Sequence, residues 1–279
     1  MPLHPSTFPA FVIALIACGW IPAADAAGEA LPRWEAGIAV GGASLPQYMG
    51  SDERYTFALP VPFVIYRGDR LNLDRNGLRA ELFGNHDVSL DASLGIGLPV
   101  RNSNRARAGM PNLYFSLQAG PRINWRLYAG EQSDWTVRLP WRGVMDVKGH
   151  YLGWVSEPDL RLRYQLTGDA SLRLTAGALF ASRKFNAHYY DVDPAYVTAV
   201  RPAYQSGAGL HSLSLSGALF WKISPRIRAF STLRYRNLSS GVVSNSPLVK
   251  TPHYLSGAIG IAWSFYQSDE RAGSDPELD

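Results

Sequence analysis

Cysteine is nearly absent from this 279-residue sequence, in which Cys18 is the single example. Cys18 lies in an N-terminal leader that we expect to be removed. Removal excludes disulfide bonds, thiolate nucleophiles and cysteine-ligated metals from the mature chain. The alternative is a lipoprotein, because Leu15-Ile-Ala-Cys18 resembles a lipobox in which the cysteine is acylated and becomes the first residue.

Long hydrophobic runs are also missing. The longest extends from Ala10 to Ile21, which is shorter than the roughly 20 residues that a helix needs to cross hydrocarbon. It fits the apolar region of a signal peptide, although no Lys or Arg precedes it. The small residues Ala24 and Ala26 predict cleavage before Ala27. We therefore expect residues 1–26 to be a signal peptide and the protein to be exported.

Charge is sparse and scattered, since only 18% of the residues are charged and the formal net charge is +4. The arginines alternate singly with apolar residues rather than forming a basic patch, which argues against a nucleic-acid partner. With 46% hydrophobic and 12% aromatic residues, the composition also excludes disorder. No low-complexity tract or linker divides the chain, so we expect one domain.

Recognisable catalytic and metal-binding patterns are missing as well. The five histidines after the leader are isolated in the sequence, without H-x-x-x-H or carboxylate spacing. His211 beside Ser212 is the nearest approach to a nucleophile and base, but no acid has a matching spacing, and His211 falls on the apolar side of its strand. A cation held by residues 188–193 is an alternative to a solvated loop. We expect no catalytic residue, metal or cofactor, and no enzyme activity.

What the sequence does contain is a period-two alternation of apolar and polar residues. Val88 to Leu98 and Leu113 to Leu127 show it most clearly, and no helix has that period. Many of the alternating segments approach the ~9 to 11 residues that a tilted strand needs to cross a bilayer. This length favours a transmembrane antiparallel β-barrel over a soluble β-sandwich. The same alternation recurs at 34–40, 57–65, 135–147, 160–166, 170–180, 213–221, 227–235 and 255–265.

Turn lengths predict the topology, because bacterial barrels have short periplasmic turns and long outer loops. The short turns all fall on one side of the membrane and the long loops on the other if residues 70–83 form two short strands. Asn76-Gly77 would divide them, because this pair is typical of hairpins. The predicted all-β barrel then has about 12 strands within residues 27–265, with 10 as the alternative, followed by a polar tail at 266–279. The expected short turns are 67–69, 84–86, 128–134, 167–169 and 224–226, and the expected long loops are 45–55, 101–112, 148–157, 183–207 and 239–252.

Aromatic residues give an independent indication of the membrane boundary. Five tryptophans fall on the apolar side of their strands, at the ends that this topology assigns to the periplasm, as an interfacial girdle requires. They are Trp34, Trp125, Trp135, Trp221 and Trp263.

Ten arginines fall on the opposite side of the strands, where a barrel has its lumen. They could cross-link and hydrate the interior, or line an anion-attracting passage. They are Arg122, Arg126, Arg138, Arg142, Arg161, Arg163, Arg173, Arg228, Arg234 and Arg236.

The last strand, Tyr254 to Phe265, resembles the C-terminal signal that outer-membrane barrels present to their assembly machinery. Tyr254, Trp263 and Phe265 are its candidate signal residues. The departure is the polar tail, because that signal usually ends the chain.

Several segments along the chain form a recognisable series. They are Leu45-Pro-Gln-Tyr-Met-Gly-Ser-Asp52, Leu59-Pro-Val-Pro-Phe-Val-Ile-Tyr-Arg-Gly-Asp69, Asn76-Gly-Leu78 to Phe83, Arg105-Ala-Arg-Ala-Gly-Met-Pro111, Gly120-Pro-Arg122, Arg201-Pro-Ala-Tyr204, Gly207-Ala-Gly209 and Ser244-Asn-Ser-Pro-Leu248. In this order they resemble the MipA/OmpV family of outer-membrane proteins, the MltA-interacting proteins. The resemblance covers essentially the whole mature chain.

The resemblance implies a barrel in the bacterial outer membrane, in contact with lipid, that acts as a scaffold between a lytic murein transglycosylase and a murein synthase. It brings no catalytic residue. The alternatives are a small-solute channel with an arginine-rich, anion-attracting lumen, and a surface adhesin. The residues leave open whether the lumen conducts, which solute or partner binds, and the oligomeric state.

Overall fold

The computed structural model describes residues 32–67, 71–74, 77–84 and 87–270. The expected signal peptide, Cys18 and the end of the polar tail lie outside the described residues. For residues 71–74 and 77–84 the structure describes the backbone alone.

The regular secondary structure of the described chain is almost entirely antiparallel sheet, in 14 hydrogen-bonded segments. The segments are β1 (Trp34–Pro46), β2 (Arg54–Arg67), β3 (Leu71–Asp74), β4 (Gly77–Gly84), β5 (Val88–Gly97), β6 (Ser116–Ala129), β7 (Ser133–Pro140), β8 (Arg142–Asp146), β9 (Tyr151–Ser156), β10 (Asp159–Thr167), β11 (Ala170–Ala181), β12 (Gly209–Ser224), β13 (Ile227–Asn237) and β14 (His253–Gln267).

These segments make a closed barrel of 12 strands in the described residues. β7 and β8 are one strand interrupted near Trp141, because both pair with β6. In the same way β9 and β10 are one strand, because both pair with β11. Each strand pairs with its neighbours in sequence, and β1 pairs with β14 from Ser44↔Gly257 to Glu35↔Gln267, which closes the ring. The predicted strand count is confirmed.

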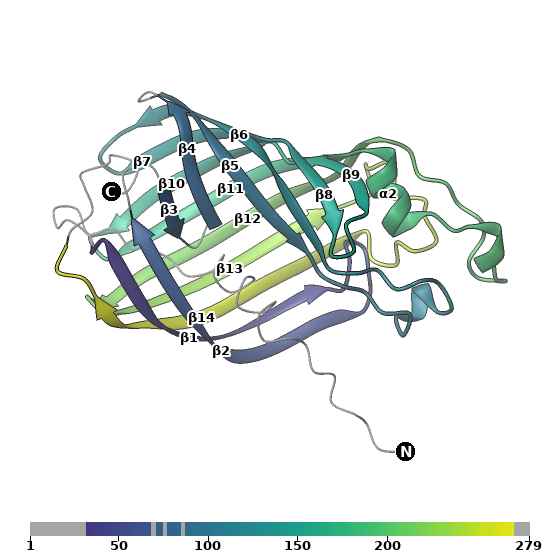
Figure 1. Cartoon of the computed structure of the whole chain (residues 1–279), viewed down its shortest axis with the longest axis horizontal. Coiled ribbons are helices and arrows are strands. Elements are labelled where there is room, and N and C mark those ends of the chain that lie inside the picture. The colour runs from purple at the N-terminus through teal and green to yellow at the C-terminus, as the bar shows by residue number, and fades with distance from the viewer. Residues whose placement is uncertain (1–31, 68–70, 75–76, 85–86, 271–279) are drawn as a thin grey trace, which may run out of the picture.

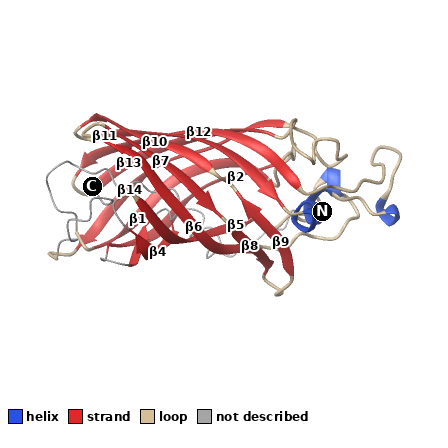
Figure 2. Cartoon of the chain, turned by 90° about the horizontal axis from the view of Figure 1, so that it is seen from above, coloured by secondary structure: helices blue, strands red, loops and turns tan. Residues whose placement is uncertain are grey.

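The two ends of the barrel differ. One end carries short turns and both described termini, and the other carries the long loops with helix α2 (Arg183–Tyr190) and the 3₁₀ turns at Arg105–Arg107 and Pro194–Tyr196 (Figures 1 and 2). We call these the short-turn end and the long-loop end. No helix in the described part of the chain is both long and apolar enough to cross a membrane.

The outer surface carries the apolar side chains of most strands. Leu117 is 51% exposed, Ile259 67% and Leu233 56%, whereas the alternating residues Ser93 and Ser116 are buried inside. A surface of this kind avoids water only if lipid covers it. The alternation thus gives the wall one lipid-facing and one inward-facing side.

β2 departs from that rule, because its larger apolar side chains point inward. Val61, Phe63 and Ile65 are buried, while Pro60 and Pro62 are exposed on the outer face. Phe63 packs in an inner apolar cluster with residues of β1, β12, β13 and β14 and with Ile65 of its own strand. The other members are Ala39, Phe220, Phe230 and Ala262. Both faces of this strand are apolar, so the period alone could not assign them.

The hairpin between β8 and β9 corrects a second expectation. Residues 148–157 are not a long loop, because strand pairing runs to Asp146 and resumes at Tyr151. The Asp146 carboxylate accepts from the backbone N–H groups of Lys148 and His150, both at 2.9 Å. Gly149 takes a positive φ of 84° in this turn. Such side-chain bonds stabilise a tight turn.

Candidate functional site: the loop lid and the cavity beneath it

Four loops at the long-loop end fold together into a lid over the barrel mouth. We define the lid as residues 47–53, 98–115, 182–208 and 238–252, which join β1–β2, β5–β6, β11–β12 and β13–β14. Figure 1 shows these loops and α2 gathered at one end of the barrel.

The lid has its own hydrophobic core, shared with the rim of the barrel. Each of the four loops contributes buried side chains, for example Tyr48, Met110, Tyr190 and Leu248. Burial of large apolar and aromatic side chains stabilises such a cluster by about 1.5–3 kcal/mol each. The lid is therefore a packed structure and not a set of independent loops.

Hydrogen bonds connect loops that are far apart in sequence. The Tyr48 hydroxyl donates to Leu248 O at 2.7 Å, and the Tyr190 hydroxyl donates to Met49 O at 2.8 Å. Arg201 Nη1 donates to the carbonyls of Ala106 and Ala108, both at 3.0 Å. These bonds fix the loops against one another.

Helix α2 brings three aromatic residues to the centre of the lid. Ser182 caps its N-terminus by accepting from Phe185 N at 3.2 Å, and the helix ends at Tyr190, before Pro194. Phe185, Tyr189 and Tyr190 are all buried. Phe185 and Tyr189 are four residues apart and so lie on the same face of the helix, and Tyr190 widens that buried face.

A cavity of about 340 Å³ lies beneath the lid. This is within the size range of small-molecule sites. Its wall is mostly apolar or aromatic, with contributions from Met49, Ile96, Leu98 and Leu179. The charged residues of the wall are Arg142, Glu157, Arg234 and Arg236.

A chain of polar contacts joins the cavity wall to α2. Arg236 Nη2 donates to Glu157 at 2.6 Å and its Nη1 donates to Ser212 Oγ at 2.7 Å. His211 contacts Ser212 Oγ through Nδ1 and the Tyr190 hydroxyl through Nε2, both at 3.0 Å. The lid is thus anchored to β12 and β13 by a buried network.

His211 and Ser212 lie side by side, as the sequence suggested, but His211 points inward and not toward lipid. An irregularity in the pairing of β11 with β12 at Leu179/Phe180 shifts the alternation at this point. His211 and Ser212 are both fully buried and both ring nitrogens of His211 have partners. A substrate has no access to this pair, so the contact is structural.

Burial governs the protonation of the lid. It lowers the pKa of His188 from 6.5 to about 4, and the nearby Arg107 contributes to the lowering. Burial also raises the pKa of Tyr190 well above its ordinary value. Both side chains are therefore neutral at physiological pH.

The ten arginines singled out in the sequence lie on the inner side of the wall, in three groups. Five lie near a carboxylate. The nitrogen–oxygen distances are 2.8 Å from Arg122 to Asp91, 3.9 Å from Arg126 to Asp134, 2.7 Å from Arg138 to Asp159, 2.7 Å from Arg228 to Glu35 and 2.6 Å from Arg236 to Glu157. Arg142 and Arg234 line the cavity. Arg161 and Arg163 lie on β10 and Arg173 lies on the neighbouring β11, where it is directly opposite Arg163. The guanidinium carbon of Arg173 lies 4.9 Å from the centroid of the Phe220 ring.

Glu35 forms the most buried of these ion-pair groups, near the short-turn end. Its side chain is fully buried and lies 2.7 Å from both Arg67 and Arg228. Ser264 donates to the same carboxylate at 2.9 Å. Arg67 was read in the sequence only as part of a turn, so this role was missed.

The five tryptophans of the expected girdle lie on the outer surface toward the short-turn end. Their exposed fractions are 43% for Trp34, 52% for Trp125, 37% for Trp135, 56% for Trp221 and 51% for Trp263. A second aromatic group that the sequence reading missed lies nearer the long-loop end, where Trp141 and Trp154 stack with ring centroids 4.3 Å apart.

The three candidate residues of the C-terminal signal do not share a face. Trp263 and Phe265 are exposed outside, whereas Tyr254 is buried in the core of the lid. Side chains of even-numbered and odd-numbered residues on one regular strand point to opposite sides. Tyr254 therefore points to the opposite side from Trp263 and Phe265. The strand continues to Gln267, two residues beyond the expected end.

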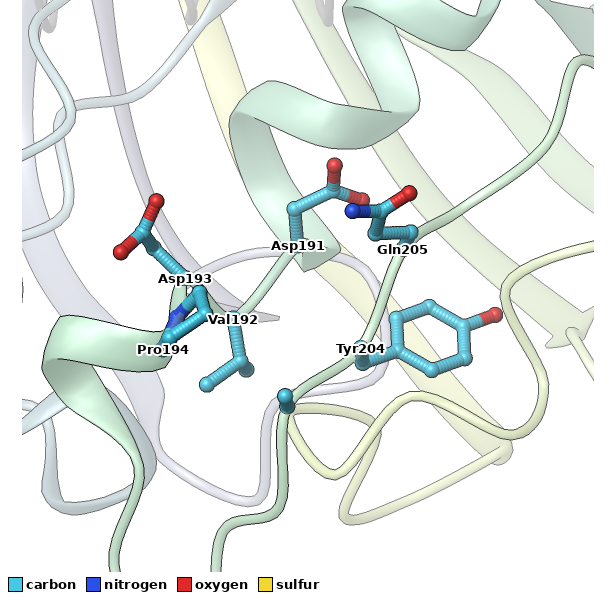
Figure 3. Close-up of a pocket in the computed structure, with 7 residues that line it drawn as sticks. Asp191, Val192, Asp193, Pro194, Tyr204 and Gln205 are labelled. Carbon is cyan, nitrogen blue, oxygen red and sulfur yellow. The ribbon is translucent and has the colours of Figure 1, made fainter.

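A second cavity, of about 250 Å³, lies on the outside of the lid between residues 191–194 and 203–205 (Figure 3). Its two carboxylates have structural partners. Asp191 accepts from the backbone and hydroxyl of Ser206 at 2.6 Å, and Asp193 accepts from Ala195 N at 3.0 Å. No group of three His, Cys, Asp or Glu side chains in the described part of the chain is placed to hold a metal ion.

A closed antiparallel barrel with an apolar outer belt, aromatic residues near its ends and charged side chains inside is the architecture of an outer-membrane β-barrel. The particular family follows from the sequence. The family described as MltA-interacting protein MipA matches residues 38–265. The chain belongs to that family.

Solved structures give more distant likenesses. The COG4313 outer membrane channel from Pseudomonas putida F1 is 12% identical with a TM-score of 0.47, and the match covers 88% of this chain and 100% of that one. The translocator domain of autotransporter NalP from Neisseria meningitidis is 13% identical with a TM-score of 0.39, and the match covers 85% and 90%. No curated protein is similar enough to this chain to count as a match.

Proposed function

We propose that this chain is a non-conducting scaffold of the outer membrane, with the lid outside the cell and the short-turn end in the periplasm. The packed lid carries this proposal. A pore needs an open mouth, whereas here four loops share a buried core across the mouth and are joined by hydrogen bonds such as Tyr48 to Leu248. The orientation follows the general rule that long loops face outward.

The name of the family indicates the partner class. An MltA-interacting protein binds a murein-degrading transglycosylase, and such a partner lies in the periplasm, where only the short-turn end is accessible. Among the described residues, the turns 130–132 and 225–226 of that rim are only three and two residues long, which leaves them little freedom to move. A rigid surface loses little entropy on binding.

The test is direct binding of purified proteins. The barrel, in lipid nanodiscs, is titrated with a purified lytic transglycosylase of the MltA class and binding is measured by interferometry. We expect binding that weakens in the rim variant Glu131→Arg combined with Arg226→Glu. The lid variant Tyr204→Phe is the matched control and should bind normally. Equal binding by all three proteins, or none by the intact barrel, overturns the proposal.

A second candidate is an anion channel, favoured by Arg161, Arg163 and Arg173, which lie together on neighbouring strands inside the barrel. A continuous path would have to pass the lid or move it. Conductance separates the two candidates, as set out at the end of the Discussion.

A further inference from the structure

The barrel wall is incomplete beside the β3–β4 hairpin. β3 pairs with β2 only at Tyr66 and Arg67, and β4 pairs with β5 only between Ser89 and Asp91. In the described part of the chain, no strand pairs with residues 54–65 of β2 or 92–97 of β5 on their facing sides. We call the region between these two segments the window. Figure 1 shows how short β3 and β4 are beside β2 and β5.

Two prolines remove hydrogen-bond donors from the β2 edge of the window. Arg67 N donates to Arg33 O at 2.9 Å, so the odd-numbered residues of β2 direct their backbone polar groups toward β1. The even-numbered residues, including Pro60 and Pro62, direct theirs toward the window. Proline has no N–H to offer there. Prolines in edge strands protect them from pairing with another strand.

On the β5 edge of the window, a side chain from inside the barrel occupies a backbone acceptor. Arg126 N donates to Asp87 O at 2.8 Å, which orients odd-numbered residues of β5 toward β6 and Leu94 toward the window. Arg142 Nη1 donates to Leu94 O at 3.5 Å. Missing donors on one edge and an occupied acceptor on the other disfavour a partner strand as the occupant of the window.

The window is bounded above by the lid. The Tyr55 hydroxyl of β2 donates to Pro99 O at 2.7 Å, and Asn104 Nδ2 donates to Gln47 Oε1 at 3.0 Å. With the β3–β4 hairpin on the opposite side, these bonds bound the region of missing strand pairing. The missing pairing is therefore local, and the barrel is not split along its length.

The cavity beneath the lid reaches the window. Gly95, Ile96 and Gly97 of the free β5 edge line the cavity together with Leu98. Ile96 occupies an outward-facing position of its strand, so it can line an inner cavity only where the wall ends. Across the window, the inward side chains Phe57, Leu59 and Val61 of β2 are all apolar.

The cavity wall carries an excess of positive charge at its inner side. Arg142, Arg234 and Arg236 face a single acid, Glu157, and Glu157 is already paired with Arg236. Arg142 Nε is buried without a hydrogen-bond partner among the described residues. Arg234 lies near Glu157, but the described ion pair of Glu157 is with Arg236. Two guanidinium groups are thus available to an anion in a largely apolar cavity.

We propose that this cavity binds an amphipathic carboxylate of the fatty-acid class, which enters through the window from the lipid phase. The carboxylate lies against Arg142 and Arg234. The hydrocarbon chain lies among the apolar residues of the cavity and extends toward the window. A small hydrophilic anion would satisfy the arginines but would leave the apolar wall of cavity and window unused.

The experiment uses the full barrel in vesicles containing a fatty acid with a diazirine near the end of its chain. After illumination, mass spectrometry locates the labelled residues. We expect label within residues 45–49 and 95–98, and competition by dodecanoate but not by butyrate. Arg142→Gln and Arg234→Gln should each reduce the labelling about tenfold, since each removes one charge-assisted hydrogen bond.

Arg173→Gln is the matched control, because Arg173 is an inner arginine that does not line the cavity, and its labelling should equal that of the unaltered chain. Heat-modifiable electrophoretic mobility verifies that each variant forms the barrel. Label confined to the outer belt overturns the proposal, as does equal labelling of all three variants. Competition by butyrate as strong as by dodecanoate would replace it with a simple anion site.

Discussion

At the scale of residues, the position of a side chain on a strand decides whether it meets lipid or the interior. Leu233 is 56% exposed on the outside of β13, and its neighbour Thr232 points inward between Ala218 and Ala258 of the adjacent strands. Leu233→Arg should lower the free energy of unfolding by about 2–4 kcal/mol. Thr232→Arg should cost far less, because small neighbours leave room. Urea unfolding in lipid measures both, and the reverse order would show that the faces are misassigned.

The Glu35 group tests whether the interior depends on paired charge. Glu35→Gln leaves Arg67 and Arg228 buried without their carboxylate, which should destabilise the barrel by about 3–5 kcal/mol. The control is Glu53→Gln, because Glu53 pairs at 3.2 Å with the well-exposed Arg105 and should cost less than about 1 kcal/mol. Similar unfolding curves for the two variants would contradict a structural role for the buried group.

At the scale of elements, the strands were predictable and the lid was not. Alternation fixed the strands because each one has a lipid side and an inner side, and Asn76-Gly77 correctly divided β3 from β4. β9 was not predicted because its alternation of apolar and polar residues is irregular. Gly153 has a φ of 111°, and the pairing of β9 with β8 is irregular at Val144. Helix α2 has only eight residues, too few for a periodic signal. The lid and the inward-facing apolar side of β2 depend on contacts between distant residues, which no local pattern contains.

His188 of α2, which is partly buried, makes the stability of the lid depend on pH. The pKa of His188 is about 4 in the folded lid against 6.5 when exposed. As pH falls from about 6.5 toward 4, the opened lid takes up a proton that the folded lid does not, so opening becomes more favourable. Above a pH of about 6.5, His188 is neutral in both the folded and the opened lid, so its contribution to lid stability no longer changes with pH. Amide hydrogen exchange of residues 183–190, corrected for the intrinsic rate, should accelerate relative to pH 7.

His188→Gln is the control for this effect, because glutamine does not titrate. Its exchange should change less between pH 7 and pH 4 than that of the unaltered chain. The same pH dependence in both proteins would assign the effect to other groups, such as the nearby Asp146, which also influences His188.

At the scale of the whole molecule, the architecture combines a lipid-facing belt, an interior of paired charges and a packed lid. The belt explains insertion in the membrane, and carboxylate partners explain how five of the ten inner arginines are tolerated inside. In the function that we propose, the closed lid is what distinguishes a scaffold from a pore. The window beside β3 and β4 is the route that we propose between the cavity and lipid, and it bypasses the lid.

The most direct test of the closed barrel is its conductance. The purified chain is inserted in a planar bilayer in concentrated salt, with electrophoretic mobility verifying that the barrel is folded. The account predicts no stable current steps from the intact chain. It also predicts that steps appear when Tyr48→Ala and Tyr190→Ala together remove the lid bonds to Leu248 and Met49. Stable, anion-selective steps from the intact chain would contradict the closed lid and establish the channel in its place.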